Sequence, residues 1–296
     1  MRGTLHLVAT EDLRRLLSVF GPTFASRGPE PKQLEEMGFE EAGIERIVEV
    51  MEAVLADDGP LTRDELADRL VERGVGIDPG SRAPNFLIRR AALRGVVCEV
   101  APKDGDNAHD RLETWVAPDE PRDWERELAG LARRYLSAYC PASLDDFTAW
   151  SGLYKRDVRT AWEVITAERI EIEVDGRPAS MLSDDVPERD RSSGDPVVRL
   201  LPGYDTYLLG YAPENRPVPE AYRSQVRPGA GIIRPTVVLN GAVVGTWKLD
   251  RSSDPPVVLV DAFDPPGGEL VSGLETEASD VGRFLGIEPE LEFVDE

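Results

Sequence analysis

One order of secondary-structure elements is predicted twice in this chain, and it restricts the fold more than any other feature. Each copy begins with an amphipathic helix whose apolar side chains recur three and four positions apart. A Pro-containing turn follows, and then Thr62 or Ser143 precedes acidic residues and an apolar run, the pattern of a helix N-cap. A third helix leads into strand, turn and strand. The first helices are predicted at residues 40–57 and 124–139, and the third helices at 83–95 and 154–168.

Helix, helix, helix and β-hairpin is the order of a winged helix, whose third helix enters the major groove of DNA. Both predicted third helices are rich in cations, and the segment from 82 to 94 has no acidic residue. These helices are therefore the candidate DNA-binding elements. The cations concerned are Arg82, Arg89, Arg90, Arg94, Lys155, Arg156 and Arg159. In the alternative interpretation, the units bind proteins and these cations pair with acidic residues elsewhere in the chain.

The overall charge of the chain is strongly negative. The sequence has 56 acidic and 34 basic residues, a net charge of -22, which by itself argues against a nucleic-acid partner. Four of the basic residues are Lys, and the acidic residues are spread evenly along the chain. This pattern is typical of proteins of salt-loving archaea, so we infer a halophilic source. In concentrated salt, local patches of Arg indicate DNA binding better than the total charge does.

The C-terminal third is predicted to be rich in β-strands. From Val197, β-branched runs alternate with turns, and Asn240-Gly241 between two apolar runs indicates a tight hairpin. A charged connection at 183–196 precedes the strands, and a final amphipathic helix is expected after them. The Pro-rich stretch 212–230 is predicted to be a long loop and a possible second DNA contact. Its cations are Arg216, Arg223 and Arg227.

Four sequence motifs give the chain a resemblance to a known family. They are Arg2 to Val8 (RGTLHLV), the DDFTAWSGL around Trp150, the LLPGYD from Leu200 to Asp205, and the GTW at Gly245 to Trp247. Together they resemble the winged-helix DNA glycosylases of the AlkZ type, over nearly the whole chain. The resemblance implies an α+β fold, with tandem winged-helix units followed by a barrel-like β-rich domain. It also implies removal of alkylated or crosslinked purines by hydrolysis of the N-glycosidic bond.

The resemblance also implies domain boundaries. The stretch 1–39 corresponds to the remnant of a first winged helix, with its wing strand and linker helix. The second and third winged helices are expected at 40–118 and 119–182, and the β-rich domain with its terminal helix at 197–296. His6 lies on the opening strand, near the family's cleft, where it could contact a phosphate or a flipped base. A packed or capping role for His6 is the alternative.

The catalytic motif that the resemblance implies is a Gln-aliphatic-Gln sequence before the opening strand. Gln33 and Gln225 are the chain's two glutamines, and neither is in a Gln-x-Gln pattern. No catalytic residue can therefore be assigned, and we expect the chain as given to be inactive. Either its start is assigned downstream of the true one, or the protein has lost a domain. The carboxylates Asp145, Asp146, Asp157 and Asp205 do not stand out as a general base.

Other features restrict the location and chemistry. No apolar run approaches the roughly 20 residues of a membrane span, and the N-terminus lacks a signal-peptide pattern, so a cytoplasmic location is predicted. Cys98 and Cys140 are distant in sequence, and neither belongs to a CxxC pair. We expect a monomer that binds double-stranded DNA, with no metal, small-molecule cofactor or membrane partner. The alternatives are a non-catalytic regulatory DNA-binding protein and a protein-interaction scaffold.

Overall fold

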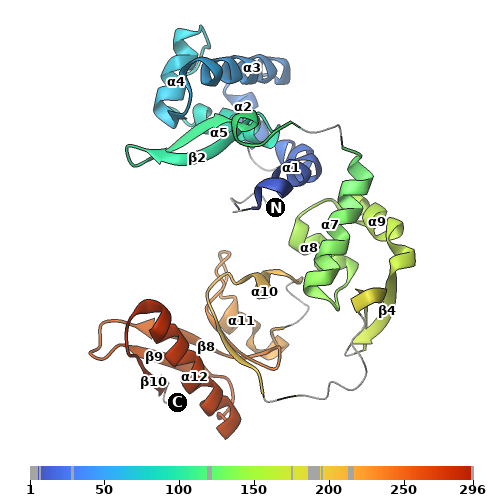
Figure 1. The fold of residues 1–296 in the computed structure, drawn as a ribbon, viewed down its shortest axis with the longest axis vertical. Coiled ribbons are helices and arrows are strands. Elements are labelled where there is room, and N and C mark those ends of the chain that lie inside the picture. The colour runs from blue at the N-terminus through green and yellow to red at the C-terminus, as the bar shows by residue number, and fades with distance from the viewer. Residues whose placement is uncertain are drawn as a thin grey trace. The chain divides into compact units, whose positions relative to one another are not determined.

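The computed structural model describes most of the chain, and the description below is restricted to those residues. They are His6, 8–27, 30–118, 122–174, 176–185, Gly194, 196–212 and 217–294. Apart from His6 and Val8, the predicted opening strand lies outside them. The fold is mixed α and β (Figure 1). The chain divides into two units, Met1–Leu131 with Gly152–Ala161, and Ala132–Ser151 with Trp162–Glu296.

The first unit is built around helix α3, which is predicted almost correctly from its apolar spacing. Its buried residues, among them Met51 and Val54, lie in a single core with Leu66 and Leu87 from two other helices. Burial of these aliphatic side chains is the main stabilising contribution here. The helices are α1 (Thr10–Ala25), α2 (Glu30–Glu36), α3 (Glu41–Asp58), α4 (Arg63–Glu72), α5 (Ala83–Leu93) and α6 (Leu112–Trp115).

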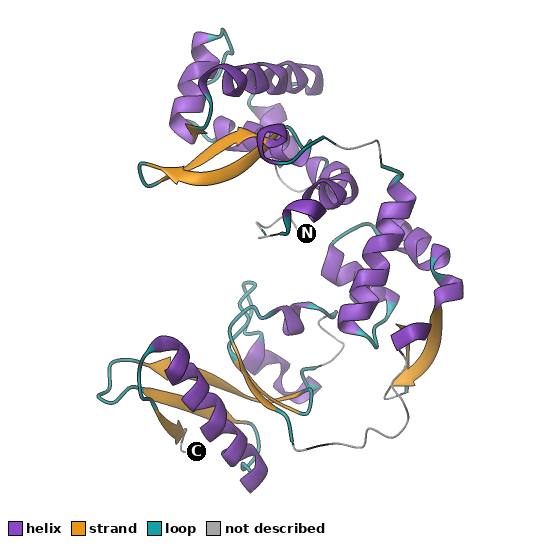
Figure 2. Cartoon of the chain, in the orientation of Figure 1, coloured by secondary structure: helices purple, strands orange, loops and turns teal. Residues whose placement is uncertain are grey.

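A three-stranded antiparallel sheet completes this unit. Strands β2 (Val97–Lys103) and β3 (Asp106–Arg111) form the predicted hairpin, which extends away from the helices (Figure 2). A short strand β1 (Leu61–Thr62) pairs with the other edge of β3, so the order is β1-β3-β2. The sequence predicts only a turn and an N-cap in this region, because two residues are too few to show strand periodicity.

The predicted N-caps are confirmed. The Thr62 hydroxyl accepts a hydrogen bond from the Glu65 backbone, and the Glu65 carboxylate accepts one from the Thr62 backbone, a complete capping box for α4. At the start of α8 (Leu144–Ser151), Asp146 and Ser143 form the same reciprocal pair. Thus, in both copies of the predicted order, the second helix begins with the same pair of reciprocal hydrogen bonds between side chain and backbone.

The second copy of the predicted order begins with α7, whose bounds agree with the prediction. Tyr135 and Phe147 are fully buried on α7 and α8, with their rings stacked 5.0 Å apart. The elements are α7 (Trp124–Tyr139), α8 (Leu144–Ser151), α9 (Lys155–Val164), the 3-10 turn η1 (Thr166–Glu168), β4 (Arg169–Val174), β5 (Arg177–Leu182) and η2 (Ser183–Asp185).

The C-terminal part of the second unit contains a five-stranded sheet. Its linear order is β10-β9-β8-β7-β6, so the described strands do not close into the barrel that the resemblance implies. The hairpin at Asn240-Gly241 is confirmed, with both residues at positive φ. The strands are β6 (Val198–Leu201), β7 (Thr236–Leu239), β8 (Ala242–Asp250), β9 (Val257–Ala262) and β10 (Glu290–Phe293).

The predicted terminal helix packs on this sheet. Helix α12 (Gly268–Leu285) buries Leu270 and Leu274 in the same core as Val258 and Val260 of β9 (Figure 1). The stretch 212–230, predicted as a loop, contains short helical turns where it is described. These turns are η3 (Glu220–Tyr222) and α11 (Arg223–Val226), and a further turn, α10 (Thr206–Leu209), lies just before the stretch.

Candidate nucleic-acid interface

The cations of α5 are mostly neutralised by acidic residues from α2 and α3. Arg90 is 4% exposed, and its Nη1 lies 3.0 and 3.1 Å from the two carboxylate oxygens of Glu41. Arg94 also pairs with Glu41, at 2.6 Å, and Arg89 pairs with the buried Glu30. The segment 82–94 has no acidic residue of its own, but in the folded protein carboxylates of α2 and α3 lie beside it. For these three arginines, the alternative interpretation of pairing within the chain describes the structure.

Arg82 differs from the other cations of this helix. It is exposed at the start of α5, and its guanidinium lies 5.0 Å from the centre of the Phe86 ring, a cation–π contact. Arg82 therefore remains available to an external anion.

The beginning of α9 carries the most exposed group of predicted cations. Lys155, Arg156 and Arg159 are all exposed, and the Arg156 side chain is 82% exposed. Asp157 is the one acidic residue among them, and it pairs with Arg156 at 3.2 Å. The Arg156 side chain is mainly solvated, whereas the Asp157 side chain is 16% exposed.

Two residues that the sequence reasoning missed complete this cluster. The Tyr154 ring, 39% exposed, contacts two guanidinium groups, those of Arg27 at 5.4 Å and Arg156 at 5.3 Å. Arg27 also donates a hydrogen bond to the Gly152 carbonyl. Arg27 follows α1, far from α9 in sequence, and no local pattern connects the two. We call Arg27, Tyr154, Lys155, Arg156 and Arg159 the α9 cluster.

His6 is exposed. The remaining histidine, His109, lies in β3 opposite Glu99 of β2. Burial lowers the pKa of His109, and the nearby Glu99 carboxylate partly offsets this effect. Its Nδ1 is buried and makes no hydrogen bond within the described part of the chain. His109 is thus held as a neutral side chain, and not as a cation facing DNA.

The carboxylates considered as bases have structural roles. Asp146, 4% exposed, accepts hydrogen bonds from the backbone of Ser143 and of Ala212. Asp205 caps α10 by accepting a hydrogen bond from the Tyr207 backbone. Both carboxylates therefore stabilise local structure.

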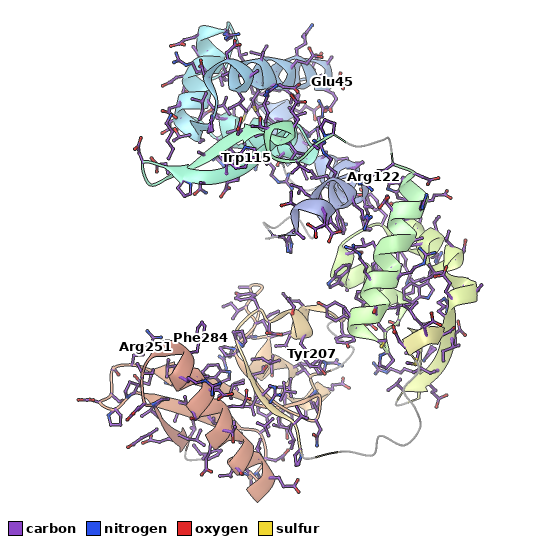
Figure 3. All side chains as sticks on the ribbon, in the orientation of Figure 1. Glu45, Trp115, Arg122, Tyr207, Arg251 and Phe284 are labelled. Atoms are coloured by element: carbon purple, nitrogen blue, oxygen red, sulfur yellow. The ribbon has the colours of Figure 1, made fainter. Side chains whose placement is uncertain are left out.

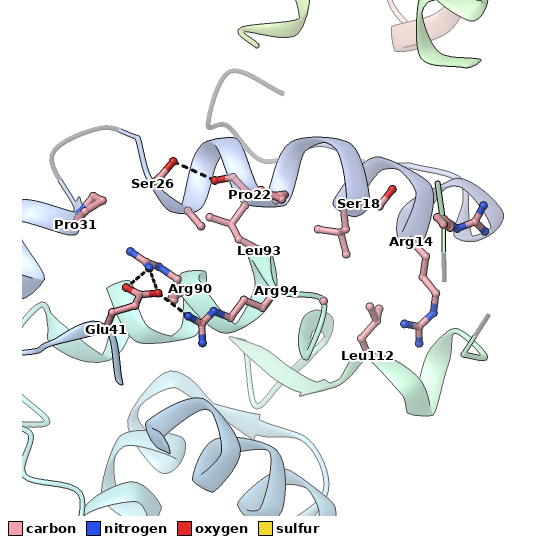
Figure 4. Close-up of a pocket in the computed structure, with 15 residues that line it drawn as sticks. Arg14, Ser18, Pro22, Ser26, Pro31, Glu41, Arg90, Leu93, Arg94 and Leu112 are labelled. Carbon is pink, nitrogen blue, oxygen red and sulfur yellow. Dashed lines mark hydrogen bonds and ion pairs between the residues drawn. The ribbon is translucent and has the colours of Figure 1, made fainter. Parts of the chain in front are cut away.

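A cleft of about 790 Å³ lies between α1 and α5 in the first unit. Its floor is apolar and includes Leu17, Leu93 and Leu112. Figure 4 shows Glu41 with Arg90 and Arg94 at one end, and Arg14 beside Leu112 at the other. The charged residues that line it are Arg14, Arg90, Arg94, Arg122 and Glu41. Arg90, Arg94 and Arg122 pair with glutamates, so Arg14 is the lining cation that could attract an anion.

The described residues include no group of three or more His, Cys, Asp or Glu side chains that could hold a metal ion. Cys98 and Cys140 are free thiols, and burial raises the pKa of each, which lowers their nucleophilicity. Among the helices that the structure describes, none is both long enough and apolar enough to cross a membrane.

Comparisons with known proteins agree on one family. The family model described as "DNA glycosylase AlkZ-like" matches residues 1–284. The interstrand DNA cross-link repair glycosylase of Streptomyces sahachiroi is 31% identical over 310 residues, covering 97% of this chain and 78% of that protein. The solved structure of Streptomyces sahachiroi DNA glycosylase AlkZ matches with a TM-score of 0.85 at 27% identity, covering 99% of this chain and 80% of the other.

Proposed function

Because this chain belongs to the AlkZ-like DNA glycosylase family, we propose that it binds double-stranded DNA as part of the repair of alkylated or crosslinked purines. The name of the Streptomyces relative, a cross-link repair glycosylase, supports the choice of damaged duplex DNA as substrate. A cytoplasmic location belongs to the same proposal. So do the monomeric state and the absence of a cofactor.

We also propose that the repeated units at 40–118 and 119–182 are winged helices. The order α3, α4, α5, β2, β3 supports the first, and α7, α8, α9, β4, β5 supports the second. The boundaries of the other two segments, 1–39 and 197–296, follow the same scheme. In this scheme α5 and α9 are the two third helices, which are the elements that winged-helix proteins place in the major groove.

One observation carries the DNA-binding proposal: Lys155, Arg156 and Arg159 are exposed at the start of α9, and the segment 155–159 has three cations and one acidic residue. The full set of predicted contacts is Arg82, Arg89, Arg90, Arg94, Lys155, Arg156, Arg159 and His6. Within this set we assign direct phosphate contact to Arg82 and the α9 residues. Arg89, Arg90 and Arg94 are assigned to holding α5 against α2 and α3, because carboxylates already pair with them.

The salt dependence of DNA affinity tests this assignment. Each phosphate contact releases counterions, so losing one lowers the slope of log K against log salt by about 0.9. The double variant Arg156→Gln with Arg159→Gln should weaken duplex binding and lower this slope by roughly 1 to 2. The matched control, Lys32→Gln with Arg283→Gln, removes the same charge from side chains that are 79% exposed. Equal slopes for the two double variants would contradict the proposal.

A second candidate function, non-catalytic DNA binding, is favoured by one specific observation. The sequence has no Gln-x-Gln pattern, the motif to which the resemblance assigns catalysis. In this candidate, the 296-residue chain binds duplex DNA but releases no N7-methylated purine above a heat-inactivated control. Clear release by the purified chain would favour the enzyme and would mean that other residues activate the attacking water.

A further inference from the structure

Trp115 is a large aromatic side chain held rigidly at the surface of the first unit (Figure 3). It is 55% exposed, whereas the other four tryptophans are buried or half-buried. Its Nε1–H donates a hydrogen bond of 2.9 Å to Oδ2 of Asp110. The indole ring therefore presents a fixed apolar surface to its surroundings.

The residue that fixes Trp115 is itself unusual. Asp110 is 4% exposed, and its other oxygen accepts a hydrogen bond from the Arg111 backbone at 2.7 Å. No ion pair to Asp110 exists within the described part of the chain. Burying a carboxylate without a cation is costly, even when two N–H donors offset part of the cost. Because Asp110 is costly to bury and holds the Trp115 indole in place, we infer that the exposed indole has a binding role.

A guanidinium group binds the backbone that follows Trp115 directly. Arg14 of α1 donates hydrogen bonds to the carbonyls of Val116, at 2.6 Å, and Ala117, at 2.8 Å. These are the two residues that follow Trp115. Among the described residues no carboxylate pairs with Arg14, so its positive charge is not neutralised. Arg14 also lines the cleft between α1 and α5, as does Leu112 from the same helical turn as Trp115 (Figure 4).

We propose that Trp115 and Arg14 bind one unpaired nucleotide of a DNA strand. The indole stacks on the base, and the guanidinium pairs with its phosphate. This inference rests on the proposed DNA-binding function and adds a site for an unstacked base. Stacking on an aromatic face is sequence-tolerant, because every base has a π surface.

The charges favour a nucleotide over a protein partner. An aromatic surface alone would suit either, since Trp is enriched at protein interfaces. The Arg14 guanidinium, with which no carboxylate pairs among the described residues, favours an anionic occupant. A nucleotide has both a flat aromatic base, which can stack on the indole, and a negatively charged phosphate, which can pair with the guanidinium. Asp110 is then a positioning residue that orients the indole.

The test compares two DNA molecules by fluorescence anisotropy: an intact duplex, and the same duplex with one unpaired thymidine. The protein with its natural sequence should bind the bulged duplex more tightly. Trp115→Ala should lower affinity for the bulged duplex about 5- to 150-fold, a size typical of one base stack, and change intact-duplex affinity less than twofold. Trp115→Phe should retain most of the preference because the ring remains. Arg14→Gln should also reduce it.

The matched control is Phe284→Ala, which removes another exposed aromatic ring, 88% exposed on α12 (Figure 3). It should leave the preference unchanged. Thermal melting of each variant separates loss of binding from loss of folding. If Trp115→Ala and Phe284→Ala give the same ratio of affinities, the nucleotide site is wrong, while duplex binding still supports the proposed function. If the natural protein binds neither DNA, the proposed function and this inference are both wrong.

Discussion

Arg90 carries its charge inside the first unit, where it connects three helices. Its guanidinium pairs with the exposed Glu41, and its Nε lies 4.0 Å from the buried Glu30. From the sequence, one would expect replacement of Arg89 and Arg90 to weaken DNA binding without affecting stability. The structure changes that expectation, because Arg90 is 4% exposed and its removal takes away a buried guanidinium that pairs with Glu41, while Arg89 still pairs with Glu30.

We therefore predict that Arg90→Ala destabilises the protein by roughly 3 kcal/mol, the size seen when one member of a buried ion pair is removed. Arg156→Ala is the control, because its side chain is 82% exposed, and it should change stability by less than about 0.5 kcal/mol. Urea unfolding of both variants measures the difference. Equal stability of the two variants would mean that the Arg90 pairs contribute nothing.

A second prediction at this scale concerns His109, whose pKa is lowered by burial. Because the folded protein holds His109 neutral, the unfolded chain binds more protons below the ordinary His pKa of about 6.5. Stability from this residue is complete above that value and is lost as the pH falls toward the lowered pKa. His109→Gln should flatten the change in melting temperature between pH 7.5 and pH 5. An unchanged pH profile in the variant would show that His109 is not responsible.

The elements differ in how well the sequence predicts them. Helix α7 is predicted at its observed bounds because its apolar stripe is regular and its whole length is amphipathic. Strands β1 and β10 were not predicted: they are short, and pairing with β3 and β9 creates them. The same limit applies to the site. The α9 cations are visible in the sequence, but Arg27 joins them only through the fold.

Helix α12 offers a prediction about packing between elements. A Cβ added at Gly273 would lie 2.3 Å from Cγ2 of Val198 on β6, so the helix could not keep its distance from the sheet. Gly273→Ala should destabilise the protein by about 1 to 3 kcal/mol through overpacking. Gly130→Ala in α7 meets nothing within 4 Å and should stabilise by about 0.5 to 1 kcal/mol. Chemical denaturation that gives both variants the same sign would contradict this packing.

The whole molecule carries a net charge of -22, and its self-repulsion should make stability depend on salt. The Debye length falls from about 10 Å at 0.1 M to about 3 Å at 1 M. We predict that the melting temperature rises by roughly 5 °C over this range of KCl, which corresponds to one or two kcal/mol. DNA affinity should fall over the same range. A melting temperature that stays constant or falls would show that the acidic residues are already balanced locally.

The charge network of α5 has a consequence for how sequences of this kind can diverge. Arg89, Glu30, Arg90, Glu41, Arg94 and Glu45 form an alternating chain of ion pairs across α2, α3 and α5. Replacing one of the inner residues of this chain leaves its ion-pair partners without a counter-charge. A sequence that changes one position at a time therefore passes through a less stable protein. We expect homologues either to keep these positions together or to replace them jointly by apolar residues. Such coupling should be visible among homologous sequences as covariation of the six positions.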